Sequence, residues 1–194
     1  MSASDSTKQA LGHALVKQLE VRPLDKVTVS SLAGEIGITR QAFYYHFADA
    51  YELAIWVFET DIANHIMRHA TYREWADGFT TMLAYMRSHR DQVYAVVNSL
   101  SHRKLERFFY ETLHAMMEAI VTELEGDLRL DPEDRAFIID HYTLSVLGHL
   151  LHWLADGMRS DPTVLVSKLA IIMQGNVRSS LDRFAWREPT LGGS

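Results

Sequence analysis

Residues 28–47 read TVSSLAGEIGITRQAFYYHF, and this stretch predicts two short helices joined by a tight turn. Thr28 stands where a side-chain cap would begin the first helix. Gly37 follows the apolar residue Ile36, at the point where a helix end favours a residue that tolerates positive φ. Thr39 supplies a second cap, so the stretch predicts a helix-turn-helix pair.

The second of these helices has an apolar face and a polar face. Phe43 and Phe47 are four residues apart, so they share the side that packs inward. Long polar or amphipathic side chains occupy the other side, namely Arg40, Gln41, Tyr44 and Tyr45. A helix of this kind enters the major groove in helix-turn-helix proteins that bind DNA. The pattern therefore predicts a DNA-reading helix.

The run LAGEIGITRQAFYYHF, with Asp49 and the pair Glu52-Leu53 after it, closely resembles the DNA-binding signature of the TetR family of bacterial regulators. The resemblance covers residues 8–55, and beyond them the chain matches only in architecture. It implies an all-α fold of about nine helices, with a three-helix helix-turn-helix domain followed by a helical ligand-binding and dimerisation domain. We expect the DNA-binding domain at residues 1–48, the second domain at residues 49–187 and a flexible tail at residues 188–194.

The resemblance also implies which residues contact DNA. They are Thr28, Thr39, Arg40, Gln41, Tyr44, Tyr45 and His46. Arg40 and Gln41 are suited to read base edges, because Arg pairs with guanine and Gln with adenine. In the resemblance, phosphates would mainly be contacted by Thr39, Tyr44, Tyr45 and His46. A half-buried packing role is an equal alternative for Tyr45. Many relatives have Lys where this chain has Ala50, so a phosphate contact there would depend on backbone amides.

Composition and charge indicate a chain that folds inside the cell. Hydrophobic residues make up 47% of the 194 residues, and there is no cysteine to form a disulfide or a thiolate metal site. The net charge is −6, but residues 1–50 carry five basic and five acidic residues, so the acidic excess lies outside the predicted DNA-binding domain. No apolar stretch approaches the roughly 20 residues of a membrane span. We expect a cytoplasmic protein without a membrane partner.

Apolar spacing predicts further helices at residues 50–69, 73–90, 92–100, 103–125, 132–156 and 162–184. The middle helices combine Met, aromatic residues and His, which suits an adjustable pocket for a small, largely apolar effector. The predicted pocket residues are Trp75, Phe79, Met82, Met86, Phe109, Leu113, His114, Met117, His141 and Tyr142. Core packing alone explains the same spacing, and for any single residue it is the stronger interpretation.

The last two predicted helices indicate a homodimer. Residues 132–156 are apolar on nearly every side, so that helix must be covered twice, and a second copy in a four-helix interface would supply the cover. The predicted interface residues are Leu147, Leu151, Leu154, Leu165, Leu169, Ile172, Met173 and Val177. Within this region residues 148–158, GHLLHWLADGM, are similar to relatives that include regulators of dihydroxyacetone metabolism.

The sequence shows no catalytic pattern: it lacks a Gly-rich phosphate loop, a nucleophile elbow and a His-Glu-x-x-His run. His65 and His69 have the i, i+4 spacing of paired metal ligands, but no third ligand is apparent, so a chance pair on an exposed face is the better interpretation. We therefore expect no enzyme activity, no cofactor and no metal.

Together these patterns predict a ligand-responsive transcription regulator. In the family pattern it is a repressor that binds a palindromic DNA operator as a homodimer, and a small effector releases it. The alternative is a co-regulator that keeps the same fold and acts by binding a partner protein instead of DNA.

Overall fold

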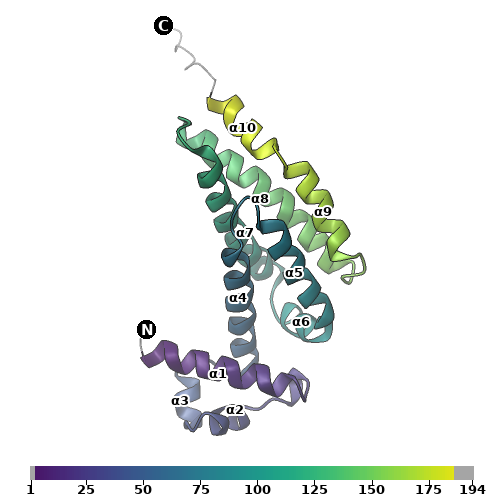
Figure 1. The fold of residues 1–194 in the computed structure, drawn as a ribbon. Coiled ribbons are helices and arrows are strands. Elements are labelled where there is room, and N and C mark those ends of the chain that lie inside the picture. The colour runs from purple at the N-terminus through teal and green to yellow at the C-terminus, as the bar shows by residue number, and fades with distance from the viewer. Residues whose placement is uncertain (1–2, 186–194) are drawn as a thin grey trace. The chain divides into compact units, whose positions relative to one another are not determined.

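The computed structural model describes residues 3–185, and within that range the chain is helical and contains no strand (Figure 1). The predicted all-α class is confirmed. In chain order the elements are α1 (Ala3–Leu19), the 3-10 helix η1 (Leu24–Lys26), α2 (Val29–Glu35), α3 (Arg40–Tyr44), α4 (Ala50–Arg68), α5 (Trp75–Ser88), α6 (Arg90–Val97), α7 (His102–Glu125), α8 (Pro132–Ala155), α9 (Pro162–Met173) and α10 (Asn176–Ala185). The predicted tail, residues 188–194, lies outside the described residues.

The chain forms two compact units. The first comprises the chain up to Ile62 together with His89–Ser101, and so contains α1, α2, α3, α6 and most of α4. The second comprises Ala63–Ser88 and the chain from His102 onward. Helix α4 begins in one unit and ends in the other. The predicted domain boundary between residues 48 and 49 follows the end of the DNA-binding motif, and it stays a prediction.

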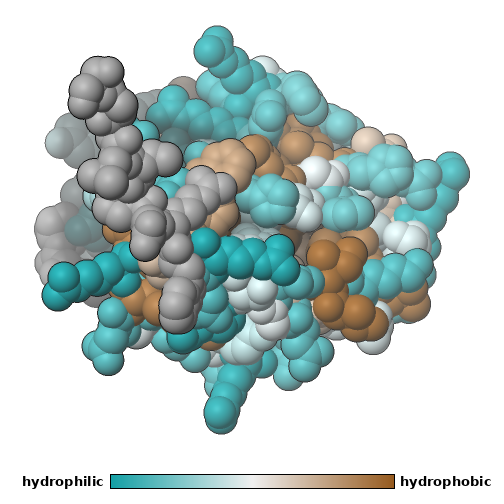
Figure 2. Space-filling model, turned by 90° about the horizontal axis from the view of Figure 1, so that it is seen from above, coloured by the Kyte–Doolittle hydropathy of each residue, from teal (hydrophilic) through white to brown (hydrophobic). Residues whose placement is uncertain are grey.

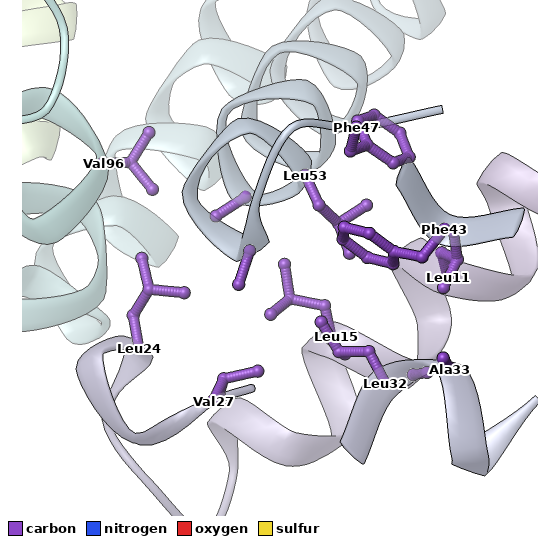
Figure 3. Close-up of a cluster of buried hydrophobic side chains, with 13 residues drawn as sticks. Leu11, Leu15, Leu24, Val27, Leu32, Ala33, Phe43, Phe47, Leu53 and Val96 are labelled. Atoms are coloured by element: carbon purple, nitrogen blue, oxygen red, sulfur yellow. The ribbon is translucent and has the colours of Figure 1, made fainter. Parts of the chain in front are cut away.

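The first unit has a small hydrophobic core to which each of its helices contributes (Figure 3). Leu15 of α1, Leu32 of α2, Phe43 of α3 and Leu53 of α4 are all fully buried. Val96 of α6 joins them, although it lies far along the sequence. Helices α2 and α3, with seven and five residues, are too short to be stable alone, so this shared core holds the helix-turn-helix pair in place.

The second unit is built on α7 and α8, which lie side by side and run in opposite directions (Figure 1). This arrangement brings Arg135 at the start of α8 to Glu125 at the end of α7, and the Arg135 guanidinium donates to that carboxylate over 2.8 Å. Helix α10 packs on both of them, and α9 packs on α5. Helices α8 and α9 begin as predicted, each with an Asp cap followed by Pro at the first helical position.

The helix predicted at residues 162–184 is in fact two helices. Helix α9 ends at Met173 and α10 begins at Asn176. Between them Gly175 has φ +76°, a conformation that ends a helix and that other residues adopt only at a cost. The apolar spacing continues across the break, because both helices turn their apolar sides to the same core, and periodicity alone therefore did not reveal it.

Candidate nucleic-acid interface and effector core

The helix-turn-helix pair is held by two side-chain caps and one glycine. Thr28 Oγ1 accepts from the Ser31 amide at 3.1 Å, and Ser31 Oγ accepts in return from the Thr28 amide. Thr39 Oγ1 caps α3 by accepting from the Ala42 amide at 3.1 Å. Gly37 has φ +73° in the turn between them. Both predicted caps and the predicted role of this glycine are confirmed.

Helix α3 presents a polar face to solvent, because Phe43 alone turns into the core. Arg40 and Gln41 are exposed in the first turn of the helix. The Arg40 guanidinium lies 6.0 Å from the centre of the Tyr44 ring and donates to the Tyr44 hydroxyl at 3.3 Å. The two exposed side chains thus form a pre-arranged pair at the solvent face of α3.

Tyr45 and His46 follow at the end of α3. Tyr45 is 82% exposed, so the alternative of a half-buried packing role is wrong. Its ring meets the His46 ring edge-on at 5.0 Å. His46 is half-buried and also lies 6.5 Å from the Phe47 ring, which is part of the core. Tyr45 therefore remains available to a ligand such as a DNA phosphate, while His46 connects the surface to the core.

A polar network that the sequence analysis missed fixes α1 against α2. Gln18 is 6% exposed; its amide nitrogen donates to Glu35 at 2.8 Å, and its amide oxygen accepts from Ser31 Oγ at 2.9 Å. Lys17 pairs with Glu35 at 2.8 Å. Hydrogen bonds from Lys17 and Gln18 hold the pKa of Glu35 below its ordinary value. The sequence did indicate that Gln18 is buried, because this residue continues the buried stripe of Leu11 and Leu15 at helical spacing.

The start of α4 is less suited to a phosphate than the resemblance implied. Ala50 is buried, and carboxylates already occupy nearby amides. Asp49 Oδ1 accepts from the Glu52 amide at 2.8 Å, and the Glu52 carboxylate accepts from the Ala48 amide. Two acidic side chains at this end would repel a phosphate, so the exposed face of α3 is the stronger candidate for DNA contact.

Most of the predicted pocket residues are buried in the second unit. Eight are between 0% and 7% exposed: Trp75, Phe79, Met82, Met86, Phe109, Leu113, Met117 and Tyr142. His141 instead lies on the exposed side of α8, where its ring stacks near Phe137. The core is thus rich in Met and aromatic side chains that can repack around a small molecule.

His114 belongs to a polar cluster between α7 and α8. Its Nε2 lies 3.5 Å from Asp140 Oδ1, and the Tyr110 hydroxyl donates to the same oxygen at 2.6 Å. The hydrogen bond to Asp140 is the main cause of the raised pKa of Tyr110. Because His114 already faces a carboxylate, it serves the α7–α8 contact in this structure, and its role in a pocket stays a prediction.

A surface hollow of about 400 Å³ lies elsewhere in the second unit, between the end of α5 and the start of α9. It is lined by Ala84, Arg87, Ser88, Asp161, Pro162 and Thr163, which include no predicted pocket residue. Arg87 and Asp161 form an ion pair of 3.5 Å within it. Asp161 also caps α9, so both charged side chains of the hollow already have partners.

His65 and His69 act in packing. His65 Nε2 donates to the Gly78 carbonyl at 3.0 Å, and His69 Nδ1 donates to the His65 carbonyl at 3.1 Å. Both rings are half-buried, so the expectation that this pair lies on an exposed face is wrong. His69 packs so closely on Gly78 that any side chain at position 78 would clash with it. Among residues 3–185, no group of three or more His, Asp or Glu is arranged to hold a metal ion.

Five of the predicted dimer residues are buried within their own chain, at 0–4% exposure: Leu147, Leu154, Leu169, Met173 and Val177. Leu151 and Leu165 are half-buried, and Ile172 is 58% exposed. Side chains that are already covered have little surface left for a partner. The predicted interface needs side chains on the outer sides of the same two helices.

Such side chains are present, and we call them the outer stripe. It consists of Phe137, Leu144 and Leu151 on α8, and Val164, Ile171 and Ile172 on α9; apart from Leu151 these are 51–71% exposed. Members seven residues apart lie two turns apart on one side of a helix. Figure 2 shows a few hydrophobic patches on a face that is otherwise mostly hydrophilic. Buried residues of α8 such as Ile139, Val146 and Trp153 have the same spacing, so exposure and not periodicity distinguishes the outer stripe from the core.

Residues 73–175, more than half of the chain, match the TetR-type family model described as "Transcriptional regulator C-terminal region". The chain belongs to the TetR family of transcription regulators. The expectation drawn from the helix-turn-helix stretch is therefore confirmed by the other part of the molecule. Family members are regulators and not enzymes. Within residues 3–185, no helix is both long enough and apolar enough to cross a membrane.

Individual relatives agree with this assignment. The chain is 23% identical, over 140 residues, to the HTH-type dhaKLM operon transcriptional activator DhaS of Lactococcus lactis subsp. lactis, covering 71% of this chain and 74% of DhaS. A solved structure of the dihydroxyacetone kinase operon activator DhaS superposes with a TM-score of 0.63 at 19% identity, covering 89% of this chain and 97% of that one.

A second solved structure, the TetR family repressor AlkX from a Dietzia strain, is implicated in biodegradation of n-alkanes. It superposes with a TM-score of 0.57 at 19% identity, covering 90% of this chain and 96% of AlkX. At these identities the two structures establish the shared TetR fold. The similarity to DhaS agrees with the resemblance of residues 148–158 to regulators of dihydroxyacetone metabolism.

Proposed function

We propose that this TetR-family protein binds a palindromic DNA operator as a homodimer and that a small, largely apolar effector releases it. The observation that carries the proposal is the exposed face of α3. Arg40, Gln41, Tyr44 and Tyr45 all lie on it, and the Arg40–Tyr44 contact arranges two of them in advance. Pre-arranged side chains lose less conformational entropy when they bind.

Homodimer formation is needed because one recognition helix is a weak DNA binder. Helix α3 has five residues, and residues 1–50 carry no net positive charge. Two such helices, spaced about one DNA turn (roughly 34–36 Å) or somewhat more apart, would read two half-sites of a palindrome. The outer stripe of α8 and α9 provides the apolar surface on which two copies would meet, in a four-helix arrangement.

An effector would act by preferring one of two arrangements of the protein. The Met-rich core of the second unit supports a small apolar molecule, since Met82, Met86, Met116 and Met117 are all buried there. Helix α4 runs from that unit into the helix-turn-helix unit, so a shift of α4 would transmit binding to α3. We place the protein in the cytoplasm, with DNA as its macromolecular partner.

The sign of regulation has two candidates. We propose a repressor, which is the common role in this family and the role of AlkX. The similarity of this chain to DhaS, an activator, specifically favours an activator role. Placing the recovered operator within or upstream of a promoter distinguishes the two, because a repressor blocks polymerase and an activator recruits it. A co-regulator that captures a protein would bind no duplex at all.

The test is selection of the purified protein against a random duplex library at low and near-physiological salt. We expect a palindrome to be enriched. The double variant Arg40→Ala, Tyr44→Ala should lose at least about 2 kcal/mol of operator affinity, because each good base or phosphate contact is worth about 1–3 kcal/mol. Arg129→Ala, an exposed loop position in the second unit, removes the same charge elsewhere and serves as control. If the double variant bound as tightly as the control, the assignment of α3 would fail.

A further inference from the structure

One buried hydroxyl in the second unit has no partner. Within residues 3–185, Thr143 Oγ1 is the buried side-chain polar atom that makes no hydrogen bond. Thr143 lies in α8 and is 0% exposed. A buried hydroxyl without a partner is unfavourable, and native proteins rarely keep one without a use for it.

Other threonines of the same unit show that the partner is readily available. In α5 and α7, Thr80, Thr81, Thr112 and Thr122 each donate to the carbonyl four residues earlier, over 2.8–2.9 Å. Thr143 occupies an equivalent place in a regular helix, with the Ile139 carbonyl four residues before it. Its hydroxyl makes no bond to that carbonyl and remains without a partner.

Those surroundings are apolar. Ile139, Val146 and Leu147, one turn before and after Thr143 on α8, are at most 4% exposed. On α7, the helix that packs against α8, Phe109 and Leu113 are fully buried. None of these side chains can bond a hydroxyl.

The same core holds no charge. The buried polar residues of the described chain are Gln18, Thr112 and Thr143, and of these only the two threonines are in the second unit. An ionised ligand would therefore find no counter-charge, and burying it would be costly. Met82, Met86, Met116 and Met117 are buried in the unit and can change rotamer to admit a guest.

We propose that the Thr143 hydroxyl anchors an uncharged ligand that has an apolar body and one hydroxyl or carbonyl group. This rests on the proposed effector response, and it adds the chemical class of the effector and the residue that selects it. The ligand's polar group bonds Thr143 Oγ1, and its body takes a place among the Met and aromatic side chains. Alcohols, ketones and aldehydes fit this description, whereas carboxylates and ammonium compounds do not.

The probe for the test is 1-octanol, titrated calorimetrically into the purified full-length protein, with octanoate at neutral pH as the charged molecule of the same length. Thr143→Val keeps the shape of the side chain and removes the hydroxyl, and Thr143→Ser retains it. Thr112→Val is the matched control, because Thr112 is also buried but bonds its own helix. Thermal unfolding of each variant without ligand is measured alongside.

We expect 1-octanol to bind the wild type, Thr143→Ser and Thr112→Val, and to bind Thr143→Val about five-fold or more weakly, the loss of one hydrogen bond. Octanoate should bind more weakly than 1-octanol. Without ligand, Thr143→Val should unfold no earlier than the wild type, whereas Thr112→Val should unfold earlier. Equal binding to Thr143→Val, no binding to the wild type, or early unfolding of Thr143→Val without ligand would each overturn the proposal.

Operator binding by Thr143→Val without alcohol separates this proposal from the proposed function. If that variant binds the operator normally but loses 1-octanol, both stand. If the wild type binds 1-octanol but enriches no duplex from the library, the DNA-binding proposal fails while the anchor stands. If operator binding is normal and the alcohol result is negative, only the Thr143 proposal fails.

Discussion

Leu144→Ala should weaken the proposed dimer by a factor that can be worked out from one exposed side chain. Leu144 is 55% exposed in the single chain, in the middle of the outer stripe. Fully burying a Leu side chain contributes about 1.5–3 kcal/mol, so covering the exposed part contributes about 1–1.5 kcal/mol. A two-fold interface uses the residue twice, which gives about 2–3 kcal/mol, or roughly 30- to 150-fold in Kd.

Sedimentation over a range of protein concentrations measures this Kd directly. Leu144→Glu should weaken the dimer further, because it adds a carboxylate that must lose its hydration. Val21→Ser is the control, since Val21 is a 76% exposed residue of the first unit, outside the outer stripe. Unchanged association in both Leu144 variants would refute the outer stripe as the interface. A folded monomer that no longer binds the operator would support the dimer as the DNA-binding form.

Three further predictions concern the helix-turn-helix unit. Gly37→Ala should destabilise the unit by about 1 kcal/mol in denaturant unfolding, because the φ angle of Gly37 is +73°. Gly34→Ala is the matched control and should stabilise the unit, because Gly34 is helical. At neither position would the added Cβ meet an atom within 4 Å. Equal effects would contradict the turn geometry. Phe43→Ala should cost about 3–5 kcal/mol and abolish operator binding, as filter binding and unfolding together would show; a stable variant would mean that the core is misplaced. Because the pKa of Glu35 is lowered in the folded protein, its carboxylate stabilises the fold at pH values above the ordinary pKa of 4.5. That stabilisation is lost as the pH falls below 4.5 and through the lowered pKa of the folded state. Unfolding midpoints should therefore drop over this acidic range in the wild type, and drop less in Glu35→Gln.

Several features of the helix-turn-helix were predictable because they are local. A cap requires a hydroxyl three residues before its amide, and Thr28 and Thr39 satisfy that requirement within their own turns. Gly37 has its role because of the backbone angle at one residue. The same holds for the starts of α8 and α9, where Asp and Pro are adjacent in sequence. Such interactions span a few residues, so their pattern is visible in the sequence.

The candidate contacts that depend on neighbours distant in sequence were harder to predict. Tyr45 could be assigned to the surface only once the core around Phe43 was in place. Gln18 needed the position of Glu35, on another helix, before its buried amide could be recognised as satisfied. The outer stripe could not be separated from the core by apolar spacing, since both repeat at helical intervals on α8.

The sequence by itself therefore determined the all-α class, the helix-turn-helix and the starts of α8 and α9, because caps, turns and periodicity act over one or two turns of chain. The resemblance of the helix-turn-helix stretch indicated the TetR family. Only the tertiary structure decided which apolar residues face inward and which outward. It also revealed that Gly175 divides the last predicted helix and that the Thr143 hydroxyl is buried without a partner. Burial and the satisfaction of polar groups depend on what packs against a side chain, and for α8 that means α7 and α10, which are separate helices of the folded unit.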